Sequence, residues 1–125
     1  MTGERDTAIR VLVADDHAVV RAGIVALLAS EPDITVVGEA TDGEQAVERA
    51  LALQPDVVVM DVRMPGLTGD AATARIRERD PAVRVLVLTT YESDASILAA
   101  IEAGASGYLL KAAPAEELIA GVRSV

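Results

Sequence analysis

The chain has 125 residues, a length that suits one domain able to bury about 65% of the surface of its unfolded chain. Twenty acidic residues against eleven basic ones give a net charge of −9, which would repel the phosphates of a nucleic acid. Aromatic residues are confined to two tyrosines, so stacking platforms for single-stranded nucleic acid are excluded as well. Without cysteine, and with His17 as the single histidine, the chain also excludes disulfides, thiolate nucleophiles and cysteine- or histidine-rich zinc sites.

Membrane insertion and export are not expected either. No apolar run reaches the roughly 18 residues that a membrane-spanning helix needs. The first ten residues carry four charges and lack the apolar segment of a secretory signal. We therefore expect a cytoplasmic protein that does not contact membranes.

Short β-branched runs alternate with longer segments of helical periodicity from Ile9 onwards. This alternation is typical of βαβ units built around a parallel sheet. Strands are predicted at residues 10–14, 35–38, 57–60, 85–88 and 108–110. The three central strands are nearly all apolar, as expected for strands that are covered on both faces.

A helix is predicted after each strand. The predicted helices comprise residues 18–29, 43–53, 69–78, 94–103 and a last segment that begins at Pro114. The first of them places Val20, Ile24 and Leu27 at helical spacing on one side. The pattern predicts a doubly wound α/β domain over residues 9–125, preceded by a tail at residues 1–8. The last helix stops in mid-period, so we expect that it belongs to a longer protein.

Polar side chains follow four of the five predicted strands. Asp15 and Asp16 follow the first strand, Asp61 the third, Thr89 the fourth and Lys111 the fifth. In an open α/β sheet, ligands bind beyond the carboxyl ends of the strands. We therefore expect these five side chains to meet at one edge of the sheet.

The chemistry of these residue types points to phosphoryl transfer. Neighbouring carboxylates raise one another's pKa unless a cation is present, and Mg²⁺ is a cation that accepts carboxylates and also binds phosphate. A carboxylate such as Asp61 can then attack phosphorus and form an acyl phosphate. The Thr89 hydroxyl and the Lys111 ammonium can hold the phosphoryl oxygens.

Four motifs carry a resemblance to a known family. They are VLVADDH at residues 11–17, VMDVRMPG at 59–66, LVLTTY at 86–91 and GASGYLLK at 104–111. In order and spacing they resemble the response-regulator receiver domain, the CheY-like partner of sensor histidine kinases. The resemblance implies a (βα)5 fold of the flavodoxin and CheY type, with a five-stranded parallel sheet in the order 2-1-3-4-5.

The resemblance also implies roles for individual residues. Asp61 would be the phospho-acceptor, and Mg²⁺ would be held by Asp16, by Asp61 and by the backbone carbonyl of Arg63. Asp15 would contribute to the metal site through water. Thr89 and Lys111 would contact the phosphoryl group.

On activation, the resemblance implies that Thr89 moves towards the phosphate and that Tyr108 turns inward. Arg63 and Tyr91 are expected near the mouth of the site, where we expect them to influence the lifetime of the phosphoryl group. One departure from the family is that Ala112 and Ala113 separate Lys111 from Pro114, whereas many receivers have a proline directly after the lysine.

The motifs resemble most closely the NarL/FixJ branch of the family. This implies a cognate sensor histidine kinase as phosphoryl donor and formation of a homodimer on phosphorylation. It also implies a helix-turn-helix output domain outside this chain, through which DNA would be bound and transcription controlled. The domain would not be an enzyme, apart from its own phosphoryl transfer and autodephosphorylation.

Taken singly, each motif also has a purely structural interpretation. Asp16 and Thr89 could cap helices, Asp61 could belong to a turn, and Lys111 could be a solvated charge. His17 is expected to be a structural residue at a helix start. The coincidence of all five residues at strand ends is what favours a functional site.

Two other functions share parts of this pattern. An aspartyl-phosphate phosphatase would need a second aspartate two residues after the nucleophile, where this chain has Arg63. A flavodoxin-type protein would need a loop rich in glycine and hydroxyl groups after the first strand, where this chain has two aspartates. A degenerate receiver that signals without phosphate would lack one of the pocket residues, and none is missing.

Overall fold

The computed structural model describes residues 8–89, 98–99 and 101–125. Within these residues lie five strands: β1 (Ile9–Ala14), β2 (Ile34–Ala40), β3 (Val57–Asp61), β4 (Arg84–Thr89) and β5 (Gly107–Leu110). They form one sheet in the order β2-β1-β3-β4-β5, and every neighbouring pair is parallel. The predicted strand order is thereby confirmed.

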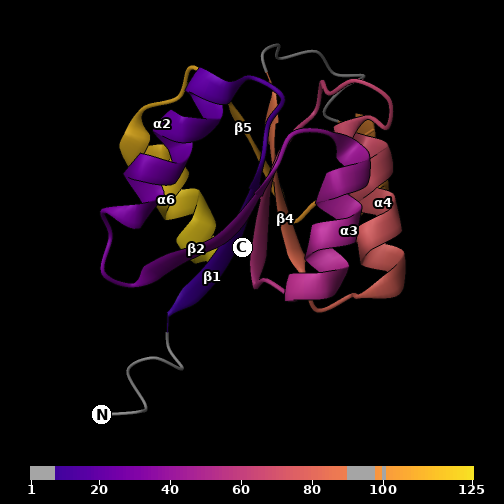
Figure 1. Ribbon diagram of the computed structural model, residues 1–125, viewed down its shortest axis with the longest axis horizontal. Coiled ribbons are helices and arrows are strands. Elements are labelled where there is room, and N and C mark those ends of the chain that lie inside the picture. The colour runs from indigo at the N-terminus through magenta and orange to yellow at the C-terminus, as the bar shows by residue number, and fades with distance from the viewer. Residues whose placement is uncertain (1–7, 90–97, 100) are drawn as a thin grey trace.

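Helices cover both faces of this sheet. They are α2 (Ala18–Ala29), α3 (Gly43–Leu53), α4 (Gly69–Arg79) and α6 (Ala115–Ser124). Figure 1 shows α2 and α6 on one side of the sheet and α3 and α4 on the other. The predicted helix at 94–103 falls largely outside the described residues, although residues 98, 99, 101 and 102 are helical. In the described part of the chain, no helix has the length and apolar character needed to cross a membrane.

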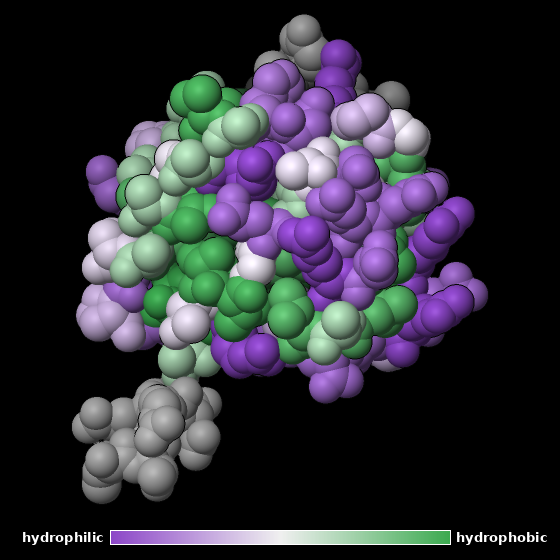
Figure 2. All heavy atoms as spheres, viewed as in Figure 1, coloured by the Kyte–Doolittle hydropathy of each residue, from purple (hydrophilic) through white to green (hydrophobic). Residues whose placement is uncertain are grey.

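The alternation of side chains along the strands divides the core into two layers. On β1, Val11 and Val13 belong to the apolar cluster beneath α2 and α6, whereas Leu12 and Ala14 belong to the cluster beneath α3 and α4. Successive residues of a strand point to opposite faces, so a strand covered on both sides must be apolar at every position. The outward face of α3 is hydrophilic, whereas hydrophobic residues gather around α2 and the edge strand β2 (Figure 2).

The observed element ends differ from the predicted ones by a few residues. The largest difference is in β2, which extends to Ala40 because Glu39 and Ala40 pair with Val13 and Ala14 of β1. Glu39 is exposed, and an edge strand tolerates a polar side chain on its solvent face. Pro114 is the residue before α6 and has an extended backbone, so the helix begins one residue later than predicted.

Two glycines allow the segment between β3 and α4 to pack closely. A Cβ atom on Gly69 would lie 2.1 Å from the backbone oxygen of Asp61, and one on Gly43 would lie 2.0 Å from that of Leu67. Both distances are far below ordinary contact distance, and both obstacles are backbone atoms, which cannot rotate away. Gly69 therefore sets how closely the start of α4 approaches the end of β3.

We expect Gly69→Ala to lower the free energy of unfolding by about 1–3 kcal/mol, because the added methyl group overpacks the junction of β3 and α4. Gly23→Ala is the matched control, since nothing lies within 4 Å of a Cβ atom on Gly23 in α2. That control should raise the free energy of unfolding by roughly 0.5–1 kcal/mol. Urea unfolding measures both values, and a Gly69→Ala protein as stable as the wild type would contradict this account.

A charged cluster joins α6 to the turn between α2 and β2. The guanidinium of Arg123 donates two hydrogen bonds of 2.8 Å to the carboxylate of Asp33 and one of 2.8 Å to Glu31. The hydrogen bonds from Arg123 hold the pKa of Asp33 below its ordinary value of 3.8. All three side chains are partly exposed, so solvent and salt weaken the cluster.

The lowered pKa of Asp33 predicts how this cluster depends on pH. A carboxylate whose pKa is lower in the folded than in the unfolded state stabilises the fold above its unfolded pKa, and the benefit is lost as the pH falls through the folded value. Arg123→Ala should therefore lower the unfolding temperature slightly at neutral pH, and this difference should shrink below pH 3.8. Thermal unfolding of both proteins across this range checks it, and a difference that does not vary with pH would count against it.

Candidate functional site

The carboxyl edge of the sheet brings together the acidic residues that the sequence singled out. Asp15 directly follows β1 and Asp61 is the last residue of β3. These strands are neighbours, with Ala14 opposite Met60, so the two aspartates emerge side by side. Both are almost completely buried, with 1% and 2% of their surface exposed. Burying two carboxylates next to each other is costly unless positive charge compensates them.

Asp16 and His17 complete a group of possible metal ligands. One ligand atom from each of Asp15, Asp16, His17 and Asp61 lies within 4.8 Å of the others. His17 stands at the N-cap position of α2, as expected for a residue at a helix start, but its side chain makes no capping hydrogen bond. Instead, its Nδ1 lies 3.1 Å from Oδ1 of Asp16. Asp16 therefore does not cap the helix, and its carboxylate faces the cluster.

Lys111 supplies positive charge to the two buried aspartates. Its Nζ donates a hydrogen bond of 2.7 Å to Oδ2 of Asp61 and forms an ion pair with Oδ2 of Asp15 at 3.1 Å. The side chain is only 18% exposed, so Lys111 is not a solvated charge. The loop that carries it is closed by a hydrogen bond of 3.0 Å from the N–H of Ala113 to the carbonyl of Leu110. The described residues contain no cis peptide bond.

Burial and pairing act on the pKa values of this pair in different ways. Burial raises the pKa of Asp61 above its ordinary value, and the hydrogen bonds from Lys111 and from the N–H of Arg63 offset only part of this. For Lys111, burial favours the neutral amine, but the hydrogen bonds and charges of Asp61 and Asp15 outweigh it and raise its pKa. Lys111 therefore stays protonated. A divalent cation bound here would lower the pKa of Asp61 and so oppose the effect of burial, since it favours the charged carboxylate.

The donor set of this site fits a divalent cation with oxygen ligands. Asp15, Asp16 and Asp61 carry three negative charges and Lys111 one positive charge, which leaves a net charge of −2. Two carboxylate oxygens are buried with one nitrogen neighbour each: Oδ2 of Asp15 has Nζ of Lys111 at 3.1 Å, and Oδ1 of Asp16 has Nδ1 of His17 at 3.1 Å. A carboxylate oxygen can accept more than one contact, and a hard cation would use the capacity that remains. A magnesium or calcium ion suits these ligands better than zinc.

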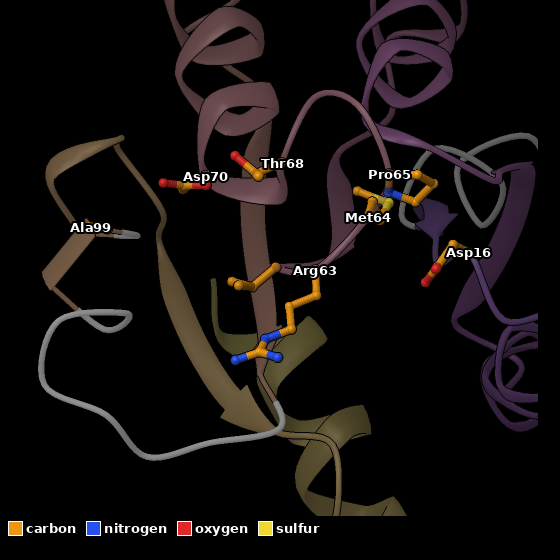
Figure 3. A pocket seen from close by; sticks show the side chains of 8 residues that line it. Asp16, Arg63, Met64, Pro65, Thr68, Asp70 and Ala99 are labelled. Atoms are coloured by element: carbon orange, nitrogen blue, oxygen red, sulfur yellow. The ribbon is translucent and has the colours of Figure 1, made fainter.

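A pocket of about 620 Å³ adjoins this cluster. It is lined by Asp16, Val62, Arg63, Met64, Pro65, Thr68, Asp70 and Ala99. Figure 3 shows Asp16 on one side and Thr68 and Asp70, at the start of α4, on the other. The long side chain of Arg63 extends away from Thr68 and Asp70. The pocket therefore meets the acidic cluster at Asp16 and extends from there to the start of α4.

The remaining predicted residues take separate positions. Thr89 is the last residue of β4 and is 5% exposed, and its carbonyl accepts a hydrogen bond of 2.8 Å from the N–H of Lys111. Tyr108 lies on the edge strand β5 and is 43% exposed. Arg63 lines the pocket, as expected for a residue at its mouth. Tyr91 lies outside the described residues.

The sequence interpretation missed two contributors to this edge. The sequence predicts Gly69 only as the start of a helix, whereas the structure shows that its lack of a side chain lets α4 approach Asp61. Arg21 was not considered, yet its guanidinium reaches the backbone of Asp15. Its position in the first turn of α2 was a usable signal, because helical side chains point back towards the N-terminus of their helix.

Comparisons with known proteins identify the family of this chain. The family model described as the response regulator receiver domain matches residues 11–123. The chain is 44% identical over 116 residues to the transcriptional regulatory protein LiaR of Bacillus subtilis, covering 93% of this chain and 55% of that protein. It is also 44% identical over 117 residues to the response regulator GacA of Pseudomonas aeruginosa, covering 94% of this chain and 55% of that protein.

Among solved structures, the signal receiver domain of the putative response regulator NarL from Mycobacterium tuberculosis is similar, with a TM-score of 0.90 and 38% identity. That match covers 93% of this chain and 94% of the NarL domain. The chain spans about half the length of the curated relatives it matches. The match to the family model and the similarity to these relatives agree with the predicted resemblance to the NarL type, and the chain belongs to the response-regulator receiver domains.

Proposed function

We propose that this chain is a signalling switch in which Asp61 accepts a phosphoryl group. The observation that carries the proposal is the Asp61 carboxylate, buried beside Asp15 and Asp16 and hydrogen bonded to Lys111 at 2.7 Å. A structural role alone does not account for two buried acids sharing one lysine, because apolar side chains would fill this position at lower cost. Membership of the receiver family supports the same function.

In this reaction, an oxygen of the Asp61 carboxylate attacks the phosphorus atom of the donor. A new oxygen–phosphorus bond forms, and the bond between phosphorus and the donor's leaving group breaks with its electron pair. Lys111, already next to Asp61, stabilises the negative charge on the transferring group, and Thr89 at the end of β4 donates its hydroxyl hydrogen to a phosphoryl oxygen. Attack by water on the phosphorus of the acyl phosphate then breaks the bond to the Asp61 oxygen, releases inorganic phosphate, regenerates the Asp61 carboxylate and ends the signal.

The metal of this proposal is Mg²⁺. Asp16, Asp61 and the backbone carbonyl of Arg63 would hold it, and Asp15 would contribute through water. When bound, Mg²⁺ neutralises negative charge on the carboxylates and on the transferring phosphoryl group. The three neighbouring carboxylates, which have only one ammonium between them, support its presence.

The wider function of the protein follows from its relatives. We propose a sensor histidine kinase as phosphoryl donor, in the cytoplasm, where such receivers meet their kinases. Residues 1–8 would form a tail, and residues 9–125 a receiver domain attached to a helix-turn-helix output domain that binds DNA. Two relatives are named as a transcriptional regulatory protein and a response regulator, and each is nearly twice as long as the matched region.

We propose that phosphorylation is transmitted by Thr89 and Tyr108. Thr89 would move towards the phosphate, and Tyr108, which is 43% exposed on β5, would turn inward. The hydrogen bond between the N–H of Lys111 and the carbonyl of Thr89 couples the ends of β4 and β5 and supports joint movement. The changed surface would then favour a homodimer.

Phosphorylation can be tested directly with acetyl phosphate and Mg²⁺. Intact-mass measurement should show an increase of one phosphoryl group in the wild type, because Asp61 takes the group and acetate leaves. Asp61→Asn should abolish the increase, since an amide is not a nucleophile here. Removal of Mg²⁺ with a chelator should also abolish it.

Asp80→Asn is the matched control for this experiment. Asp80 is the C-cap residue of α4 and precedes β4, so it lies at the opposite edge of the sheet from Asp61. This variant should gain the phosphoryl group as the wild type does. A mass increase that persists in a folded Asp61→Asn protein would refute the proposed acceptor.

Lys111→Met separates phosphoryl acceptance from metal binding. The ammonium occupies the carboxylates that would hold Mg²⁺, so removing it should tighten Mg²⁺ binding while phosphorylation by acetyl phosphate slows by about 10-fold or more. Calorimetric titration with Mg²⁺ and the time course of the mass increase measure the two effects. Phosphorylation at the wild-type rate would show that Lys111 does not assist the transfer.

A further inference from the structure

Arg21 links the acidic cluster to the edge strand β2. It lies in the first turn of α2, and its Nη1 donates a hydrogen bond of 2.8 Å to the backbone carbonyl of Asp15. Its Nε donates one of 3.0 Å to Oε1 of Glu39. The Arg21 side chain is only 16% exposed, whereas that of Glu39 is 47% exposed. The guanidinium thus bridges the backbone carbonyl of Asp15 and the carboxylate of Glu39.

Arg21 provides one of three hydrogen bonds that hold Asp15 in place. The N–H of Asp15 donates a hydrogen bond of 3.0 Å to the carbonyl of Ala40, and Oδ1 accepts one of 2.8 Å from the N–H of His17. With Arg21 on its carbonyl, every polar atom of Asp15 except Oδ2 is bound outside the site, and Oδ2 pairs with Lys111 at 3.1 Å. Oδ2 is therefore the atom through which Asp15 contributes to the site.

Fixing the Asp15 carbonyl also fixes the residue that follows. The peptide unit between Asp15 and Asp16 is planar, so the position of its oxygen determines the orientation of the N–H and Cα of Asp16. Arg21 achieves this through a backbone atom, and no hydrogen bond from it to the carboxylate of Asp15 or Asp16 occurs among the described residues. A cation near an acidic site would otherwise compete with a metal for the carboxylate oxygens.

We propose that Arg21, oriented by Glu39, is a positioning residue for the metal site. It holds the segment of Asp15 and Asp16 so that their carboxylates converge on one cation, and it does so without binding a carboxylate oxygen of either residue. The inference rests on the proposed function, because it assigns Arg21 to the Mg²⁺ site of that reaction. Outer partners that orient metal ligands typically contribute about 10–100-fold to metal affinity.

The sign of one measurement separates positioning from simple electrostatics. Arg21 carries a positive charge near the cluster, so removing that charge alone would reduce repulsion and tighten Mg²⁺ binding. Loss of positioning has the opposite effect. We expect Arg21→Ala to weaken Mg²⁺ binding about 10-fold in calorimetric titrations without any phosphoryl donor. The apparent Mg²⁺ constant for phosphorylation by acetyl phosphate should rise in parallel, while the rate at saturating Mg²⁺ changes much less.

Arg49→Ala is the matched control, since Arg49 on α3 donates a hydrogen bond to the backbone carbonyl of Glu39. That variant removes the same charge from the same neighbourhood without touching Asp15, and its Mg²⁺ affinity should be unchanged or slightly higher. Arg21→Lys keeps the charge and the aliphatic stem but not the fork that spans two acceptors, so it should bind Mg²⁺ less tightly than the wild type.

If Arg21→Ala does not fold, as judged by circular dichroism and thermal unfolding, Arg21→Lys decides the question. A folded Arg21→Ala or Arg21→Lys protein that binds Mg²⁺ as tightly as the wild type, or more tightly, overturns the inference and leaves the proposed function intact. A wild-type protein that does not bind Mg²⁺ overturns both.

Discussion

The site depends on the ion pair between Lys111 and two aspartates that the fold forces together. Parallel strands all end at one edge, and the adjacency of β1 and β3 puts Asp15 and Asp61 side by side with almost no access to solvent. One ammonium shared by two carboxylates leaves the site short of positive charge. In the proposed function, the same shortage would give the site its affinity for a cation and, with that cation, its capacity to accept a phosphoryl group.

The rest of the chain supports this edge mechanically. The two apolar layers hold the strands in register, so the carboxylates are placed by the most rigid part of the molecule. The absence of a side chain at Gly69 lets α4 begin directly against Asp61, and Arg21 fixes the backbone on the other side at Asp15. The carboxylates lie at strand ends and not on long loops, so their oxygen atoms are held at defined positions. A reaction between precisely placed oxygen and phosphorus atoms benefits from this rigidity.

Much of this arrangement could be predicted from the sequence. Apolar strands separated by helical periods predicted the doubly wound fold, and polar residues directly after the strands predicted which edge carries the acidic cluster. The direction of the Arg21 side chain could be predicted from its place in the first turn of α2. Its bonding partners, and the close approach at Gly69, could not, because they depend on three-dimensional packing between α2, β2, β3 and α4. The burial of Lys111 was likewise not apparent from its place after a short strand, since most lysines at such positions are solvated.

Lys111 is also the only lysine of the chain, and therefore its only side-chain amine. Amine reagents attack the uncharged form of an amine, and the two aspartates hold Lys111 in its charged form. Any event that neutralises these carboxylates would lower the pKa of Lys111 and release a more reactive amine. The rate at which an amine reagent labels Lys111 would thus depend on the charge of the Asp15 and Asp61 carboxylates.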